Sequence, residues 1–464
     1  MKGLQNIWHQ AYKIVPEQLQ RVQEVGRVVT AFNTNIDAIV KISGSQLTRL
    51  AQSVGLGAED LRCEHTRLNT PKDVVRGIIK CFSQGIAEEW LCENHQVYEW
   101  IRHNLPYARL QMGGQAGIVA NVMAVLGAKE VCAHTSSHPQ LQAEQFLDLP
   151  NLLAINQDGA AQKACTINRP NDEPLLHWIM EFSAGDVFEL AGQKYVCPKA
   201  NRFIATYDNA NLELRINGGF LQYLANNTFD YMILSGYHNL QAENGGVERI
   251  VATIPLLQTW KKANPQAIIH LELASTQDKI VRKEIVEKIA PAVDSVGLNE
   301  REALDVLEIV APQMYAAIKN TELSAPLLCN ILLRLKQKMQ TPRIQLHCYG
   351  LYLTLQDKGF AISPQANKRG MMLAAAIAAS KAGTGNIESK EKLLWAQDMA
   401  ISDAAVKNMA AIAEFLQNPM LAESGLAEMN GFDLIAVPTI IIDKPKTLVG
   451  MGDTISSVSL VGAR

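Results

Sequence analysis

The sequence predicts an α/β fold, with a central, mostly parallel sheet flanked by helices and a smaller α+β lid domain inserted into it. Three observations lead to this prediction. Short apolar runs alternate with longer segments of helical spacing, polar residues follow most of these runs, and two regions break the alternation. With 464 residues, of which 48% are hydrophobic, the chain can build a core for more than one domain-sized unit.

The apolar runs predict the strands of the sheet. Continuous apolar runs are typical of strands that are covered on both faces. In such sheets ligands bind beyond the carboxyl ends of the strands, so the polar residues after each run are candidate site residues. The predicted strands are 27–32, 231–235, 267–273, 295–298, 344–348 and 434–437.

Helical spacing predicts helices over 322–339, 370–382 and 392–415. Their Ala and Met stripes favour packing over a cofactor site.

Two regions predict the lid. Residues 43–112 are mainly helical in spacing and highly charged, and 161–221 contain short alternating pieces such as 176–182 and 188–196. We expect these insertions to form one lid, which leaves 1–42, 113–160 and 222–464 for the large domain.

Composition narrows the possible partners. A net charge of -3 without a long basic run argues against nucleic acid, and no stretch is long and apolar enough to cross a membrane. We expect a cytoplasmic protein, a monomer or small homo-oligomer. The eight cysteines are scattered without CxxC spacing, which predicts neither a zinc site nor disulfides.

The C-terminal segment 449–457 predicts an anion site. Gly450 and Gly452 let the backbone turn its N–H groups toward one point, where the start of a helix adds partial positive charge. Asp453 beside them can accept a proton from an attacking hydroxyl. A plain loop and helix cap is the alternative interpretation of the same residues.

Five ordered segments, together, carry a resemblance to a known family. They are 31–38 (AFNTNIDA), 112–117 (MGGQAG), 270–272 (HLE), 299–302 (NERE) and 450–453 (GMGD). In this order and spacing the chain resembles, over nearly its whole length, the ADP-dependent glucokinases and phosphofructokinases of the ribokinase-like superfamily. The resemblance implies a ribokinase-like large domain, a lid, a divalent cation such as Mg²⁺, ADP as phosphoryl donor, and a place in a modified glycolysis.

The resemblance also implies roles for individual residues. Asp453 would be the catalytic base, with the N–H groups of Gly450 and Gly452 on the transferred phosphoryl group. Physical chemistry agrees that Asp37 and Asn35 can hold sugar hydroxyls, that Gly114 permits close backbone approach, and that carboxylates with waters suit Mg²⁺. Caps, turns and surface ion pairs are the structural alternatives. The implied sugar site is Asn35, Asp37, Gly114 and Gln115; the implied metal site is Glu272, Glu302 and Asp453; the implied nucleotide site is Asn201, Asn299, His347, Cys348, Ile442 and Gly452.

The identity of the sugar depends on the lid. Glucose enzymes of the family carry a lid glutamate, which Glu89 matches, with Glu88 as the one-residue-shift alternative, and His177 matches a histidine that they use on glucose. A carboxylate here would repel the phosphate of fructose 6-phosphate. The cations Lys194, Lys199 and Arg202 lie nearby, so a phosphofructokinase or an enzyme of dual specificity stays open.

Two other classes stay open as well. A non-catalytic protein that binds sugar or nucleotide for regulation would be expected to lose the base or a metal carboxylate, and the chain keeps Asp453, Glu272 and Glu302. An ATP-dependent kinase of the same superfamily would share the final glycine and aspartate motif, but not the 33–37 and 299–302 segments in this form.

Overall fold

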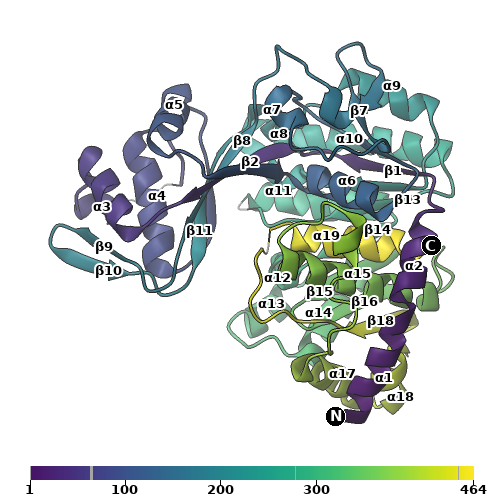
Figure 1. Ribbon diagram of the computed structural model, residues 1–464. Coiled ribbons are helices and arrows are strands. Elements are labelled where there is room, and N and C mark those ends of the chain that lie inside the picture. The colour runs from purple at the N-terminus through teal and green to yellow at the C-terminus, as the bar shows by residue number, and fades with distance from the viewer. Residues whose placement is uncertain (1, 63–65, 277, 448) are drawn as a thin grey trace.

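The computed structural model describes residues 2–62, 66–276, 278–447 and 449–464. It confirms the predicted α/β architecture, with a large domain built on one extended sheet and a lid that projects from it (Figure 1). In the part of the chain that the structure describes, no helix has the length and apolar character needed to cross a membrane.

The large sheet is parallel at its centre and antiparallel at both edges. The strands from β15 to β6 all run parallel to their neighbours, an arrangement that needs crossover connections rather than hairpins. In spatial order the strands are β17 (Leu426–Met429), β18 (Phe432–Pro438), β16 (Leu351–Gln356), β15 (Arg343–Cys348), β14 (Ser295–Leu298), β13 (Ile268–Glu272), β12 (Tyr231–Leu234), β1 (Arg27–Ala31), β5 (Glu130–Ala133), β6 (Leu152–Ile155) and β7 (Ala161–Lys163).

All six predicted strands are present, as β1, β12, β13, β14, β15 and β18. The apolar runs did not single out the other strands of the large sheet, which are β5, β6, β7, β16 and β17. Strand β16 follows β15 through a tight hairpin at Tyr349 and Gly350. The predicted helices are also confirmed, as α14 (Ala325–Met339), α15 (Pro364–Thr384) and the pair α16 (Lys390–Leu393) and α17 (Asp403–Phe415).

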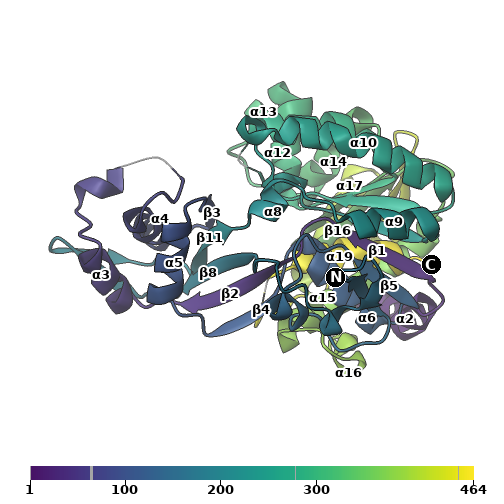
Figure 2. The ribbon, with the colours of Figure 1, turned by 90° about the horizontal axis from the view of Figure 1, so that it is seen from above.

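Helices cover both faces of the large sheet, as Figure 2 shows. One face carries α9 (Gly218–Asn226), α10 (Gly246–Ala263), α12 (Glu300–Val310), α14 (Ala325–Met339) and α17 (Asp403–Phe415); the other carries α2 (Val15–Val22), α6 (Gln115–Leu126), α15 (Pro364–Thr384) and α19 (Met451–Val461). The remaining helices of this domain are α1 (Lys2–Ala11), α7 (Gln140–Ala143), α8 (Asn209–Leu212), α11 (Lys279–Glu284), α13 (Pro312–Ile318), α16 (Lys390–Leu393) and α18 (Pro419–Ser424).

The lid has its own sheet and its own core. Its strands are, in spatial order, β3 (Glu88–Leu91), β11 (Asn201–Tyr207), β8 (Leu176–Phe182), β2 (Asn35–Lys41) and β4 (Arg109–Gly113). The helices α3 (Gly44–Ser53), α4 (Pro71–Gln84) and α5 (His95–Asn104) pack on it, and the hairpin of β9 (Val187–Leu190) and β10 (Gln193–Val196) lies at its outer end (Figure 1).

Strand pairing divides the chain differently from our expected boundaries. Strand β2 pairs with β4 and β8 of the lid sheet, although we expected residues 1–42 to belong to the large domain. Conversely, β7 joins the large sheet, and Phe220 and Leu224 of α9 pack in the large core. We had assigned the β2 segment to the large domain together with the predicted strand before it. A local sequence pattern does not determine which strand a segment pairs with.

Candidate active site

A cavity of about 250 Å³ lies between the lid sheet and the large domain. It brings together eight of the predicted site residues from segments far apart in the sequence. These are Asn35, Asp37, Glu89, Gly114, Gln115, His177, Gly450 and Asp453; Asn33, Ile118, Ile179, Arg202, Ile204, His238, Asn239 and Val449 complete the lining.

The lid wall of the cavity follows from strand alternation. Side chains of a strand point alternately to its two faces. On β8, Trp178 and Met180 are buried in the lid core, whereas His177 and Ile179 line the cavity. The same alternation on β2 places Asp37 beside His177, its partner in the strand register.

This alternation also separates Glu89 from Glu88. Glu89 lines the cavity and accepts a hydrogen bond from the Thr206 hydroxyl at 2.5 Å. Glu88 lies on the opposite face, where it pairs with Lys80 at 2.8 Å and accepts from the Trp90 indole at 2.8 Å. The geometry therefore favours Glu89 over Glu88 as the sugar ligand.

His177 is held as a cation at the lid end of the cavity. Its Nε2 donates to Asp208 Oδ2 at 3.0 Å, and its Nδ1 lies 3.8 Å from Glu89 Oε1. Burial alone would lower its pKa, but the hydrogen bond to Asp208 and the charges of Asp208, Glu89 and Asp37 raise the pKa to about 9. The imidazolium can donate to a sugar hydroxyl.

Asp37 is the acid beside His177 at the lid end of the cavity. Burial raises its pKa to about 6, against the charge of His177 and a hydrogen bond from Asn35 Nδ2 at 3.1 Å. Gly114 approaches this pair closely: its φ is 71°, and a Cβ there would lie 2.6 Å from the carbonyl oxygen of Asn33 and 2.7 Å from Asn35 Oδ1. A glycine is therefore required where the backbone meets the side-chain amide of Asn35.

Asp453 lies at the opposite end, in the first turn of α19. Its Oδ1 accepts a hydrogen bond of 2.7 Å from Gln115 Nε2. Burial raises the pKa of Asp453, whereas this hydrogen bond and the charge of Lys381 lower it. In the structure the amide nitrogen of Gln115 donates to the carboxylate of Asp453, and Gln115 lines the cavity, so its role as a sugar ligand stays a prediction.

The turn that begins α19 leaves N–H groups free for an anion. Gly450 has a left-handed φ of 61°, and a Cβ there would lie 2.8 Å from Ile118. At the next glycine, Gly452, a Cβ would lie 2.7 Å from His347 Nε2. The first N–H groups of a helix have no partner within it, so this turn can hold a phosphoryl group.

Two further carboxylates lie buried near Asp453. Burial, then the charges of Asp453 and Glu302, raises the pKa of Glu272 well above its usual range. Burial and the charge of Asp453 raise the pKa of Glu302 to about 8, against hydrogen bonds from Asn299. His270 Nε2 lies 3.3 Å from Glu272 Oε2, which places this histidine beside the carboxylate.

These carboxylates fit a hydrated divalent cation better than a fully protein-ligated one. Among the described residues, no three acidic, His or Cys side chains converge closely enough to hold a metal by themselves. The mutual repulsion of Glu272, Glu302 and Asp453 would nevertheless be relieved by a cation between them. Mg²⁺ commonly takes only one or two carboxylates, with waters and substrate phosphates as its other ligands.

The predicted nucleotide residues divide between the large domain, which holds five of them, and the lid, which holds Asn201. Asn299 caps α12 in a reciprocal capping box with Glu302, with the Asn299 N–H donating to Glu302 Oε2 at 2.8 Å. Cys348 lines a separate cavity of about 680 Å³ with Glu300, Tyr349 and others. His347 points inward, with Nε2 at 3.8 Å from Glu272 Oε1.

The two remaining nucleotide predictions lie outside both cavities. Asn201 donates to the carbonyl of Gly85 at 2.9 Å inside the lid, and its neighbour Arg202 lines the cavity instead. Ile442 packs against the large core.

Sequence reasoning missed several cavity residues. Arg202 was expected only as a cation near the lid, and His238 was not singled out, although both line the cavity. The period-2 alternation along 201–207 could have placed Arg202 on the same face as Ile204.

Seven of the cysteines are free thiols, and Cys63 lies outside the described residues.

Comparison with known sequences extends over almost the whole chain. A family model described as the ADP-specific phosphofructokinase/glucokinase conserved region matches residues 26–462. An ADP-dependent glucose/glucosamine kinase from Pyrococcus furiosus is 30% identical over 468 residues, covering 98% of each chain. An ADP-specific phosphofructokinase from Thermococcus zilligii is 28% identical, covering 96% of each chain.

Comparison with solved structures agrees. An ADP-dependent kinase in complex with fructose-6-phosphate and ADPbetaS superimposes with a TM-score of 0.82 and 25% identity, over 100% of this chain and 98% of that one. The last common ancestor of ADP-dependent phosphofructokinases from Methanosarcinales matches with the same TM-score and coverage at 26% identity.

Proposed function

Because the chain belongs to the family of ADP-specific phosphofructokinases and glucokinases, we propose that it transfers the β-phosphoryl group of Mg-ADP to the 6-hydroxyl of glucose. The products are glucose 6-phosphate and AMP. The donor follows from the family, and the acceptor from the charges at the lid end of the cavity.

The observation that supports glucose is the set of charges around Glu89. This carboxylate lies on the cavity face between Thr206, which donates to it, and His177. Asp37 adds a second acidic group on the same face. Hydroxyls can donate to these carboxylates and accept from His177, whereas a sugar phosphate would meet repulsion from both acids.

The chemistry takes place at the other end. Asp453 accepts the proton of the 6-hydroxyl as this oxygen attacks the phosphorus, and Gln115 holds the carboxylate in place through Oδ1. The N–H groups at the start of α19 hold the oxygens of the transferred group, where negative charge builds up. Lid closure would exclude water, which would otherwise compete with the sugar hydroxyl.

A divalent cation would be held by Glu272 and Glu302, with Asp453 beside them. When bound, it would screen the charge of the phosphates. The two glutamates lie on neighbouring strand ends of the large sheet, Glu272 in β13 and Glu302 after β14, which is where ligands of such sheets bind.

A second function, phosphorylation of fructose 6-phosphate, is favoured by one residue. Arg202 lines the same cavity, and a guanidinium can bind a phosphate through two hydrogen bonds. We rank this function second, because Arg202 shares the lid face with Glu89 and Asp37.

The test is a four-way rate assay with Mg²⁺ that pairs ADP or ATP with glucose or fructose 6-phosphate. Turnover with ADP and glucose supports the proposal. A preference for fructose 6-phosphate would contradict the role of Glu89 and His177, and turnover with ATP alone would contradict the donor. No turnover with any pair would favour a non-catalytic binding protein.

A further inference from the structure

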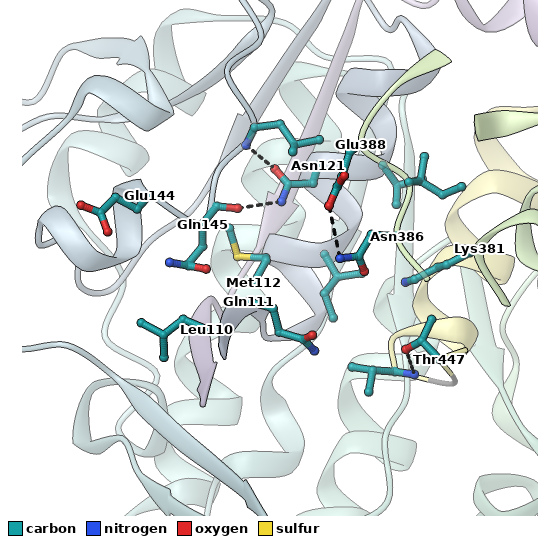
Figure 3. Close-up of a pocket in the computed structure, with 15 residues that line it drawn as sticks. Leu110, Gln111, Met112, Asn121, Glu144, Gln145, Lys381, Asn386, Glu388 and Thr447 are labelled. Atoms are coloured by element: carbon teal, nitrogen blue, oxygen red, sulfur yellow. Dashed lines mark hydrogen bonds between the residues drawn. The ribbon is translucent and has the colours of Figure 1, made fainter. Parts of the chain in front are cut away.

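A second cavity, of about 220 Å³, lies behind the turn that begins α19 (Figure 3). Ile118 and Val449 line both this cavity and the candidate active site, so the chain at Val449 separates the two. The turn that begins α19 therefore lies between the two cavities. Figure 3 shows Lys381 on the wall of the second cavity, close to Thr447.

Lys381 reaches from the last turn of α15 to the turn before α19. Its side chain is buried, at 6% exposure, and its Nζ donates to the Gly450 carbonyl at 3.0 Å and to Thr454 Oγ1 at 3.1 Å. Thr454 donates to the same carbonyl twice, from Oγ1 at 2.7 Å and from its backbone N–H at 3.2 Å. The Gly450 carbonyl thus has three donors.

These contacts fix the direction of the neighbouring N–H group. In a trans peptide the C=O of Gly450 and the N–H of Met451 point in opposite directions. Because the carbonyl is held along α19, the Met451 N–H points away from the helix, where the phosphoryl group would lie. The next residue of α15, Ala382, accepts a hydrogen bond of 2.7 Å from the Lys446 N–H, so α15 holds this segment at a second point.

The charge of Lys381 has no salt-bridge partner within the described ranges of the chain. Burial lowers its pKa to about 8, and Asp453 is the charged neighbour that opposes this shift. A buried cation without a carboxylate partner is costly for a folded protein. An anion bound at the turn would compensate this cost.

We propose that Lys381 is a positioning residue that aims the N–H groups of the turn at the transferred phosphoryl group and places positive charge behind them. The proposal rests on the phosphoryl transfer proposed above. Lys381 itself lies behind the turn and does not touch the sugar.

The experiment compares Lys381→Met with Lys381→Arg, and Thr454→Val with Thr454→Ser. Loss of one donor to developing negative charge commonly lowers kcat about 10²-fold. We expect this loss in Lys381→Met and a smaller loss in Thr454→Val, with KM for both substrates nearly unchanged. Lys381→Arg and Thr454→Ser should recover much of the rate, because each keeps a donor.

Hydrogen exchange of the free enzyme supplies a readout that does not depend on turnover. In Lys381→Met and in Thr454→Val, amides of residues 443–455 should exchange faster than in the wild type. The control is Lys336→Met: Lys336 is equally buried but lies on α14, paired with Asp357 at 2.5 Å. Its loss should lower Tm without changing kcat or exchange at 443–455.

Two results would overturn the proposal. One is wild-type kcat in Lys381→Met; the other is unchanged exchange at 443–455, since a lower kcat would then reflect general destabilisation. An inactive wild-type enzyme would contradict the proposed function instead, and the exchange result would still decide whether Lys381 holds the turn.

Discussion

At the lid end of the cavity the acids Asp37 and Glu89 lie beside a protonated imidazole, whereas at the large-domain end Glu272, Glu302 and Asp453 are buried and, among the described residues, form no salt bridge with lysine or arginine. In the first arrangement the protein itself compensates the negative charge of the carboxylates, through the imidazolium of His177 and the hydroxyl of Thr206. In the second, burial raises the pKa of all three carboxyl groups, and the charge of Asp453 raises the pKa of Glu272 and Glu302 further.

This difference assigns different tasks to the two ends. A site whose charges are balanced by its own residues can recognise a neutral ligand that offers hydroxyl groups. A site with excess negative charge is completed by a cation that arrives with the nucleotide. Sugar choice should therefore depend on the lid, and turnover on the large domain.

The largest expected effect comes from Asp453→Asn. The amide keeps the shape but cannot accept the proton, so kcat should fall about 10² to 10⁴-fold while ADP and sugar still bind. Steady-state rates and calorimetric binding would measure both quantities. Asp403→Asn is the control, because Asp403 also lies in the first turn of a helix, α17, but is exposed. A near-normal kcat in Asp453→Asn would show that another group is the base.

A large pH effect is expected for His177. An imidazole in the unfolded chain has a pKa of about 6.5, against about 9 for His177 in the folded protein. Its stabilisation is therefore complete below pH 6.5 and is lost as the pH rises through 9, on the order of 3 kcal/mol in all. In His177→Gln, the loss of stability between pH 6 and 9 should shrink by this amount.

Urea unfolding at a series of pH values would measure this effect. The exposed His103, at 73% side-chain exposure, provides the control, and His103→Gln should keep the wild-type pH dependence. The same slope in His177→Gln and wild type would mean that His177 is not protonated in the folded protein.

A smaller effect is expected for Glu302→Gln. Glutamine can keep the capping box with Asn299 but lacks the charge, so the helix should persist while the Mg²⁺ concentration for half-maximal rate rises about 10-fold. Asp305→Asn tests a neighbouring buried acid of α12 that instead pairs with Arg282 and Arg301. An unchanged Mg²⁺ titration of Glu302→Gln would argue against its metal role.

The smallest effect, and the one that tests the lid directly, is expected for Glu89→Gln. The amide can still accept from Thr206 but carries no charge, so kcat/KM for glucose should fall a few-fold to about 10-fold, and that for fructose 6-phosphate should rise. Glu88→Gln is the matched control on the other face of β3. Equal changes for both sugars would mean that the Glu89 charge does not select the substrate.

The sequence predicted those parts of the site that local patterns determine. Apolar runs located six strands, and Asp37, which follows the first run, lies in the cavity, as does Asp453 of the C-terminal glycine motif. The donor came from the resemblance alone, because five ordered motifs identify a family while spacing does not identify a nucleotide.

The parts that sequence did not predict depend on contacts between distant segments. Gln115 donates to Asp453, 338 residues away, and no local pattern predicts this contact. Lys381 belongs to an Ala-rich helix for which the sequence predicted only a packing role. Its position behind Gly450 follows from the fold. Strand β2 likewise pairs with the lid because of β8, whose position no local pattern specifies.

The most direct test of the account is a competition between equal concentrations of glucose and fructose 6-phosphate with limiting Mg-ADP. The ratio of the two products equals the ratio of the kcat/KM values. We expect glucose 6-phosphate to be the dominant product, and we expect Glu89→Gln to lower the ratio of glucose 6-phosphate to fructose bisphosphate. A mixture dominated by fructose bisphosphate in the wild type would contradict the assignment of the lid end to glucose.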